Sequence, residues 1–160
     1  MTASNGQALQ RAAVAAVRHC ATQVEDRAES LLQALPKVPM DETLRAKALE
    51  LSAVLKDTSG RVTFELALLQ VQLDEGKVDA ATALQTLSRL DATLMDELAA
   101  MADVVDQLES AAERDSGHEG AFVLVIEATG VMLQGLEKAK AATEELRAAM
   151  PTEPRGERKS

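Results

Sequence analysis

The sequence predicts an all-α protein, an antiparallel four-helix bundle with up-down-up-down order. Stop signals divide the chain into four long segments of nearly equal length, joined by short connections. In the last three segments, apolar residues recur at alternating steps of three and four, as in coiled coils. Only 1% of the residues are aromatic, so the core must consist of Leu, Val, Ala and Met. We expect one helical domain over residues 1–150.

The first helix is expected over residues 5–35. "SNGQ" at 4–7 reads as a capping box, because a serine hydroxyl and a glutamine side chain three residues later can each satisfy a free amide. Pro36 ends the helix, since proline cannot continue the hydrogen-bond ladder. Residues 1–24 contain no acid and are rich in alanine, which is also the composition of a mitochondrial presequence. The apolar spacing that continues past this stretch favours a first helix.

The second helix is expected over residues 42–75. Asp41 is a suitable N-cap, and Gly76 can adopt the left-handed conformation that ends many helices. Residues 61–73 also alternate apolar and other side chains with the period of a strand, and residues 121–128 are rich in β-branched types. Two paired strands and an α+β fold are therefore the alternative. Helix is favoured because both stretches fit the three-four spacing and two isolated strands make a marginal sheet.

The third and fourth helices are expected over residues 80–114 and 117–150. Asp79 is the N-cap of the third, and "SGHE" at 116–119 reads as a capping box that opens the fourth. The tail, residues 151–160, begins with a proline, is polar, and is expected to be disordered. The expected core positions of the third helix are Ala83, Leu87, Leu90, Leu94, Leu98, Met101, Val105, Leu108 and Ala112.

Charge and composition exclude several classes of partner. The net charge of −9 and a pI near 4.7 argue against binding a nucleic-acid backbone. With no Trp or Tyr, the chain also lacks the aromatic platforms on which single-stranded bases stack. Cys20 is the one cysteine, so no intrachain disulfide can form, which fits a reducing compartment. We therefore expect a cytoplasmic protein without nucleic-acid partners.

No pattern of residues predicts catalysis, a metal site or a cofactor. Neither His19 nor His118 has a glutamate three residues before it, as a di-iron bundle requires. There is no Gly-rich phosphate loop, no HExxH and no Cys-His pair with an orienting third group. The acids of the third helix are expected to form its solvated face. They are Asp96, Glu97, Asp103, Asp106, Glu109 and Glu113. We therefore expect no enzyme.

The stretch "GAFVLVIEATGVMLQGL" at 120–136 carries one ionised side chain, Glu127. It is too short and too polar for a membrane span of about 20 apolar residues. On a helical projection its apolar arc covers well over half of the circumference, more than one core-facing stripe requires. The excess predicts a protein interface, with small residues that allow a second helix to approach closely. The predicted interface residues are Leu124, Ala128, Gly130, Val131 and Gly135.

These observations favour a non-enzymatic adaptor or scaffold that acts through protein contacts. The expected partner is a second copy of the chain in a homo-oligomer, such as a dimer, or a helix of another protein. The alternative is an amphipathic protein that binds a lipid or granule surface. Membrane contact is disfavoured because the faces lack the Lys/Arg enrichment and the Trp/Phe anchors of interfacial helices.

Overall fold

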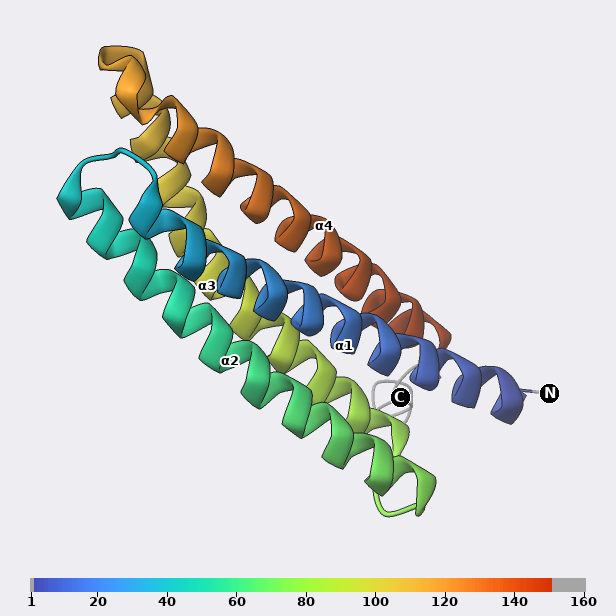
Figure 1. Ribbon diagram of the computed structural model, residues 1–160. Helices are drawn as coiled ribbons and strands as arrows, with labels where there is room; N and C mark the ends of the chain where they lie inside the picture. Colours follow the sequence, from blue (N-terminus) through green and yellow to red (C-terminus); the bar gives the residue numbers. More distant parts are fainter. Residues whose placement is uncertain (1, 151–160) are drawn as a thin grey trace, which may run out of the picture.

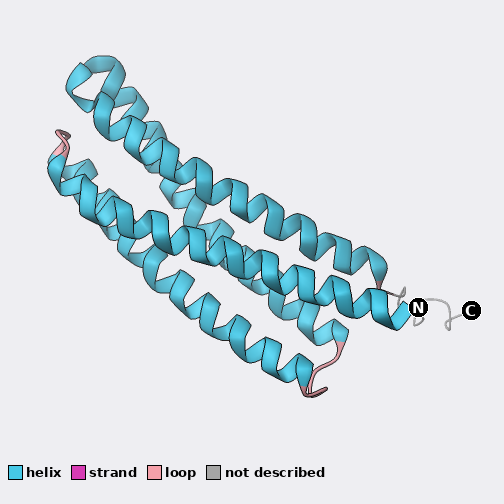
Figure 2. Cartoon of the chain, turned by 45° about the vertical axis from the view of Figure 1, so that its right-hand side comes forward, coloured by secondary structure: helices cyan, strands magenta, loops and turns pink. Residues whose placement is uncertain are grey.

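The computed structural model describes residues 2–150 and consists of four long helices within that range. They are α1 (Thr2–Ala34), α2 (Glu42–Asp74), α3 (Ala80–Arg114) and α4 (Glu119–Ala149). Two short 3-10 turns, η1 (Leu35–Lys37) and η2 (Ser116–His118), follow α1 and precede α4. Figure 2 shows that only short loops separate the helices. The expected tail, residues 151–160, lies outside the described residues.

The four helices pack as an antiparallel bundle, which confirms the predicted fold class. Helices that follow one another in sequence pack together, and α1 also packs along α4. α1 and α3 touch less, because they lie at opposite corners of the bundle. The chain runs up and down in turn, so the α1–α2 connection and the α3–α4 turn lie at the same end (Figure 1). Residues of α1 from Ala13 to Val24 are among the most buried, so the N-terminal segment supplies part of the core.

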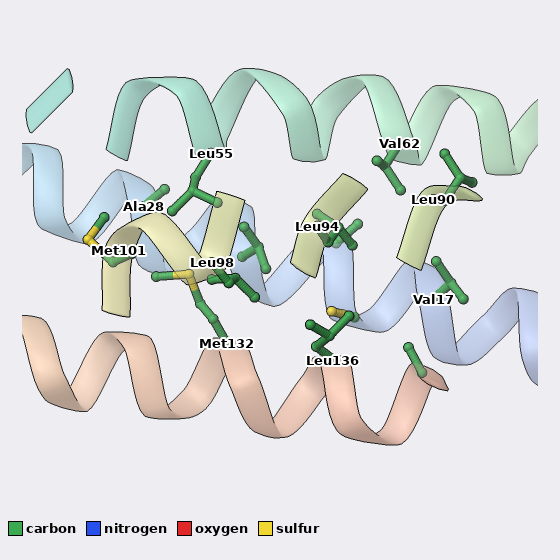
Figure 3. Close-up of a cluster of buried hydrophobic side chains, with 14 of the residues drawn as sticks. Val17, Ala28, Leu55, Val62, Leu90, Leu94, Leu98, Met101, Met132 and Leu136 are labelled. Carbon is green, nitrogen blue, oxygen red and sulfur yellow. The ribbon is translucent and has the colours of Figure 1, made fainter. Parts of the chain in front are cut away.

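The core is a continuous cluster of aliphatic side chains to which all four helices contribute. Figure 3 shows Leu55 of α2, Leu98 of α3 and Met132 of α4 directed into the same interior. The expected positions in α3 are correct as far as Met101 and are wrong in part beyond it. There Val104 and Ala111 are buried, one residue earlier than the expected Val105 and Ala112. The buried positions step by four from Leu90 to Leu94 and again to Leu98. They then step by three to Met101 and again to Val104, so a repeated step of three offsets the repeated step of four.

Three of the expected helix boundaries are confirmed by their hydrogen bonds. Asp41 accepts from the amide of Leu44 at 3.1 Å, and Asp79 accepts from the amide of Thr82 at 2.8 Å. The Thr82 amide also holds the pKa of the Asp79 carboxyl below its usual value. After α2, Gly76 adopts a φ of +71°, with the paired carbonyl contacts of a Schellman motif.

Two capping boxes and the strand alternative are wrong. α1 already includes Thr2 and Ser4, because nothing in the first residues breaks a helix, so Ser4 does not precede the helix. At the second expected capping box, residues 116–119, the capping residue is Asp115, whose carboxylate accepts from the amide of Gly117 at 2.9 Å. α4 begins only at Glu119. Residues 61–73 and 121–128 lie within α2 and α4, where helical packing overrides their β-branched content.

The end of the bundle that holds the α1–α2 connection is fastened by two side chains. The guanidinium of Arg45 donates to the carbonyls of Leu35 and Val38, at 2.6 and 3.0 Å. It thereby satisfies carbonyls that the end of a helix leaves without partners. The imidazole of His118 accepts from the backbone amide of Asp41 at 3.0 Å and so joins the two connections. The turn before α4 is therefore held to the start of α2.

Candidate protein-interaction surfaces

Four of the five predicted interface residues lie together along a groove between α1 and α4. Leu124, Ala128, Gly130 and Val131 line this groove, which has a volume of about 430 Å³. On the opposite side it is lined by residues of α1, including Leu31. We call this surface the α1–α4 groove. Leu124, Gly130 and Val131 are half-buried, so each keeps part of its surface for a partner.

Two of the small residues predicted for the interface, Gly135 and Ala128, pack within the bundle itself. Gly135 is buried, and a Cβ there would lie 2.8 Å from the Gln23 side-chain oxygen and 3.5 Å from the Cα of Cys20. Its lack of a side chain therefore lets α1 approach α4. Ala128 is also buried in the core. A role of Ala128 and Gly135 in admitting a second copy of the chain stays a prediction, although burial leaves both residues little surface for it. For Leu124, Gly130 and Val131 a role in an interface stays a prediction.

α4 keeps two large apolar side chains exposed. Val123 is 47% exposed and Ile126 is 41% exposed, and Ile126 also lines the α1–α4 groove. By length and composition, the segment Ser116–Ala149 could cross a membrane. The same properties belong to core helices of soluble bundles, and α4 packs one side on α1 and α3. α4 therefore keeps apolar side chains exposed to solvent in the folded bundle.

Two opposite charges stand at the edges of the α1–α4 groove. Arg27 of α1 and Glu127 of α4 both line it and are both exposed. Neither side chain belongs to any of the ion pairs found in the described part of the chain. Glu127 thus lies at a solvated edge of α4. Both charges can therefore pair with a molecule that lies in the groove.

A second apolar surface, on α2, was missed by the sequence reasoning. Phe64, Leu68 and Val71 are 71%, 49% and 50% exposed and lie on the side of α2 opposite its buried residues. The apparent strand alternation of residues 61–73 was the signal of this surface. Val62 and Leu66 point into the core while Phe64 and Leu68 point outward, so both sides of the helix are apolar. We call Phe64, Leu68 and Val71 the α2 stripe.

The core also holds a buried carboxyl group, that of Asp91 of α3. It is 5% exposed, its Oδ2 accepts from the Thr143 hydroxyl at 2.9 Å, and its Oδ1 has no partner among the protein atoms. Burial raises the pKa of the Asp91 carboxyl to about 6, against the opposing effect of the Thr143 hydrogen bond. Asp91 lies beside a cavity of about 250 Å³ between α3 and α4, whose rim carries Lys140 and Arg147. Asp91 therefore takes up a proton at a higher pH than a solvated aspartate does.

The residues with catalytic potential are not gathered at one site. Cys20 is buried, and desolvation together with the charge of Asp91 raises the pKa of its thiol to about 12, which leaves it protonated. His19 is exposed on α1, whereas His118 forms the loop contact described above. Among the described residues, no three His, Cys, Asp or Glu side chains gather closely enough to hold a metal ion. Of the six acids of α3 named above, five are exposed and Glu97 is half-buried, where it accepts from the Thr58 hydroxyl.

Comparison of the chain with protein-family models, curated proteins and solved structures found no match. The surfaces described above are therefore the features of the molecule from which its function is argued.

Proposed function

We propose that this protein is a non-enzymatic adaptor or scaffold that binds an amphipathic helix of another protein in the α1–α4 groove. The observation that carries the proposal is the apolar surface left on α4 around Leu124, Ile126 and Val131 after its core face is packed. An amphipathic helix that lays its apolar face into a groove between two helices is a recurring mode of recognition. A cytoplasmic location belongs to the proposal, since the one thiol of the chain is unpaired.

The charges at the groove edges define the partner further. A helix lying between α1 and α4 would place a basic side chain near Glu127 and an acidic one near Arg27. Its apolar residues would recur at steps of three and four, because only one of its faces enters the groove. Such rim charges contribute mainly to the rate of association and to specificity. The partner we propose is therefore an amphipathic helix with both charge signs on its polar face.

The experiment is a pull-down from the native host with the full chain and two variants. Ile126→Arg places a charge in the groove at an exposed position, so the bundle should stay folded, as circular dichroism would verify. Val54→Arg is the matched control, because Val54 is 42% exposed, close to the 41% of Ile126, but lies on α2 outside the α1–α4 groove. We expect a partner that the wild type and Val54→Arg capture and that Ile126→Arg loses. Capture of the same proteins by all three chains would contradict the proposal.

A flotation assay with lipid vesicles tests the alternative function. Lipid binding would be supported if the wild type floats with vesicles and Ile126→Arg does not. We expect the protein to stay at the bottom of the gradient, because the groove carries an acid at its edge and no Trp or Tyr to anchor it. Flotation would replace the proposed partner helix with a membrane surface.

A further inference from the structure

The α2 stripe is a second surface, separate from the α1–α4 groove. Phe64, Leu68 and Val71 follow one another at steps of four and three, so they lie on one face over two turns of the helix. The same face continues toward the start of α2 with Gly60, the exposed Asp57 and Ala53, so its apolar part ends at Phe64. The core residues Val62, Leu66 and Leu69 lie on the other side of α2. α2 is thus apolar on two opposite sides, and only one of these is covered within the chain.

Two charges stand at equal distances from the centre of the stripe. Arg61 lies seven residues before Leu68, and Glu75 lies seven residues after it, so both are two helical turns from it. Both side chains are well exposed, and in the described part of the chain each forms its ion pair with a near neighbour. Arg61 pairs with Asp57 at 3.4 Å, and Glu75 pairs with Lys77 at 3.1 Å. Such exposed local pairs contribute little and exchange readily for other partners.

We propose that the α2 stripe binds a second copy of this chain, with the two α2 helices antiparallel and Leu68 at the two-fold axis. In that arrangement Leu68 meets Leu68 of the second copy, and Phe64 packs on Val71 of the second copy. The symmetry repeats both contacts. Arg61 faces Glu75 of the second copy, and the reverse pair forms at the other side. A parallel pair would instead place Arg61 against Arg61 and Glu75 against Glu75, which the like charges disfavour.

The dimer predicted in this way is weak and depends on concentration. Three large apolar side chains on each copy and two ion pairs between the copies make a contact at the small end of the range. It buries less than about 1,200 Å² in total, which is typical of transient complexes. The dimer leaves the α1–α4 groove of each copy uncovered, since α4 and α2 lie at opposite corners of the bundle (Figure 1). One assembly would therefore present two grooves, which would strengthen binding to a partner that carries two helices.

Disulfide trapping tests the register. Leu68→Cys in the full chain places a thiol at the axis, so mild oxidation should join two copies through residue 68. Ala53→Cys is the matched control: it is exposed on the same face but lies fifteen residues from the axis. The native Cys20 is buried and stays out of the reaction. We expect covalent dimers from Leu68→Cys and only monomers from Ala53→Cys. Equal trapping of both variants would overturn the register.

Sedimentation velocity over a range of concentrations tests the contact and the charges. The wild type should shift from monomer to dimer as its concentration rises. Leu68→Arg should raise the dissociation constant by about tenfold or more. Val123→Arg, on α4, is the control: Val123 is as exposed as Leu68, and its substitution should leave the dissociation constant unchanged. Arg61→Glu alone should weaken the dimer, and Arg61→Glu combined with Glu75→Arg should restore it. A wild type that stays monomeric at every concentration would overturn the proposal. So would a dimer that Val123→Arg disrupts and Leu68→Arg leaves intact.

Discussion

The imidazole of His118 accepts a hydrogen bond from the backbone amide of Asp41, at 3.0 Å, across 77 positions of the chain. The contact joins the turn before α4 to the N-cap of α2, and the side chain of the same Asp41 caps that helix. His118 is therefore the residue that fixes the two connections at this end of the bundle to each other. His118 also directly precedes α4, but its side chain does not cap that helix.

Loss of the His118 side chain should loosen the α1–α2 connection without unfolding the bundle. His118→Ala removes an acceptor whose hydrogen bond is worth about 1 kcal/mol. We expect the Asp41 amide to exchange with solvent faster, while amides in the middle of α3 keep their protection. His118→Gln keeps a side-chain acceptor and should preserve most of the protection. Hydrogen-exchange mass spectrometry checks this, and an unchanged Asp41 amide in His118→Ala would contradict the role given to the imidazole.

Two glycines of α4 should respond in opposite ways to a larger residue. No heavy atom lies within 4 Å of a Cβ built at Gly130, so Gly130→Ala should stabilise the protein by up to about 1 kcal/mol through helix propensity. At Gly135, α1 leaves no room, and Gly135→Leu should push the two helices apart and lower the melting temperature. Thermal unfolding of the two variants measures both effects. A Gly135→Leu chain as stable as the wild type would show that α1 and α4 are not in contact there.

The buried Asp91 should make the protein less stable as the pH rises through the acid range. Its pKa is about 6 in the fold against 3.8 when unfolded, so folding favours the protonated carboxyl. Stability from this group is present below about pH 4 and is lost as the pH rises toward 6, by about 3 kcal/mol in all. Asp91→Asn stays neutral at every pH. The variant should therefore melt several degrees above the wild type at pH 7.5 and close to it at pH 4.

Asp91→Glu is the control for this prediction, because it keeps a titrating carboxyl on the same helix position. Its melting temperature should still fall between pH 4 and 6, as that of the wild type does. If Asp91→Asn and the wild type differed by the same amount at both pH values, burial would not be perturbing the carboxyl.

The fold could be predicted because its signals are local and repeat along the chain. Asp41, Asp79 and Gly76 mark helix ends through hydrogen bonds to residues close in sequence, and each was identified correctly. The start of α4 was harder because Asp115 and Ser116 are both good capping residues, and only the local backbone decides between them. The shift of the α3 stripe to Val104 likewise depends on how α3 meets its neighbours.

The surfaces were harder to predict, because the sequence does not show which flank of an apolar helix the fold covers. The excess of apolar residues on α4 was recognised, but the close approach of α1 at Gly135 determines which of them stay free. On α2, Phe64 and Leu68 were interpreted as part of a possible strand. In the helix they instead mark an exposed apolar surface, as the excess apolar residues of α4 do. Side chains from distant parts of the chain decide both cases, and these contacts form only in the fold.

The binding of a partner helix in the α1–α4 groove is tested most directly by photo-crosslinking from position 126 in the native host. A photoreactive benzoylphenylalanine replaces Ile126, which is exposed at the groove, and mass spectrometry identifies the peptide that it captures. We expect a peptide of another protein whose apolar residues recur at steps of three and four and whose polar face carries both charge signs. Capture of lipid alone, or of a second copy of this chain alone, would contradict the proposed function.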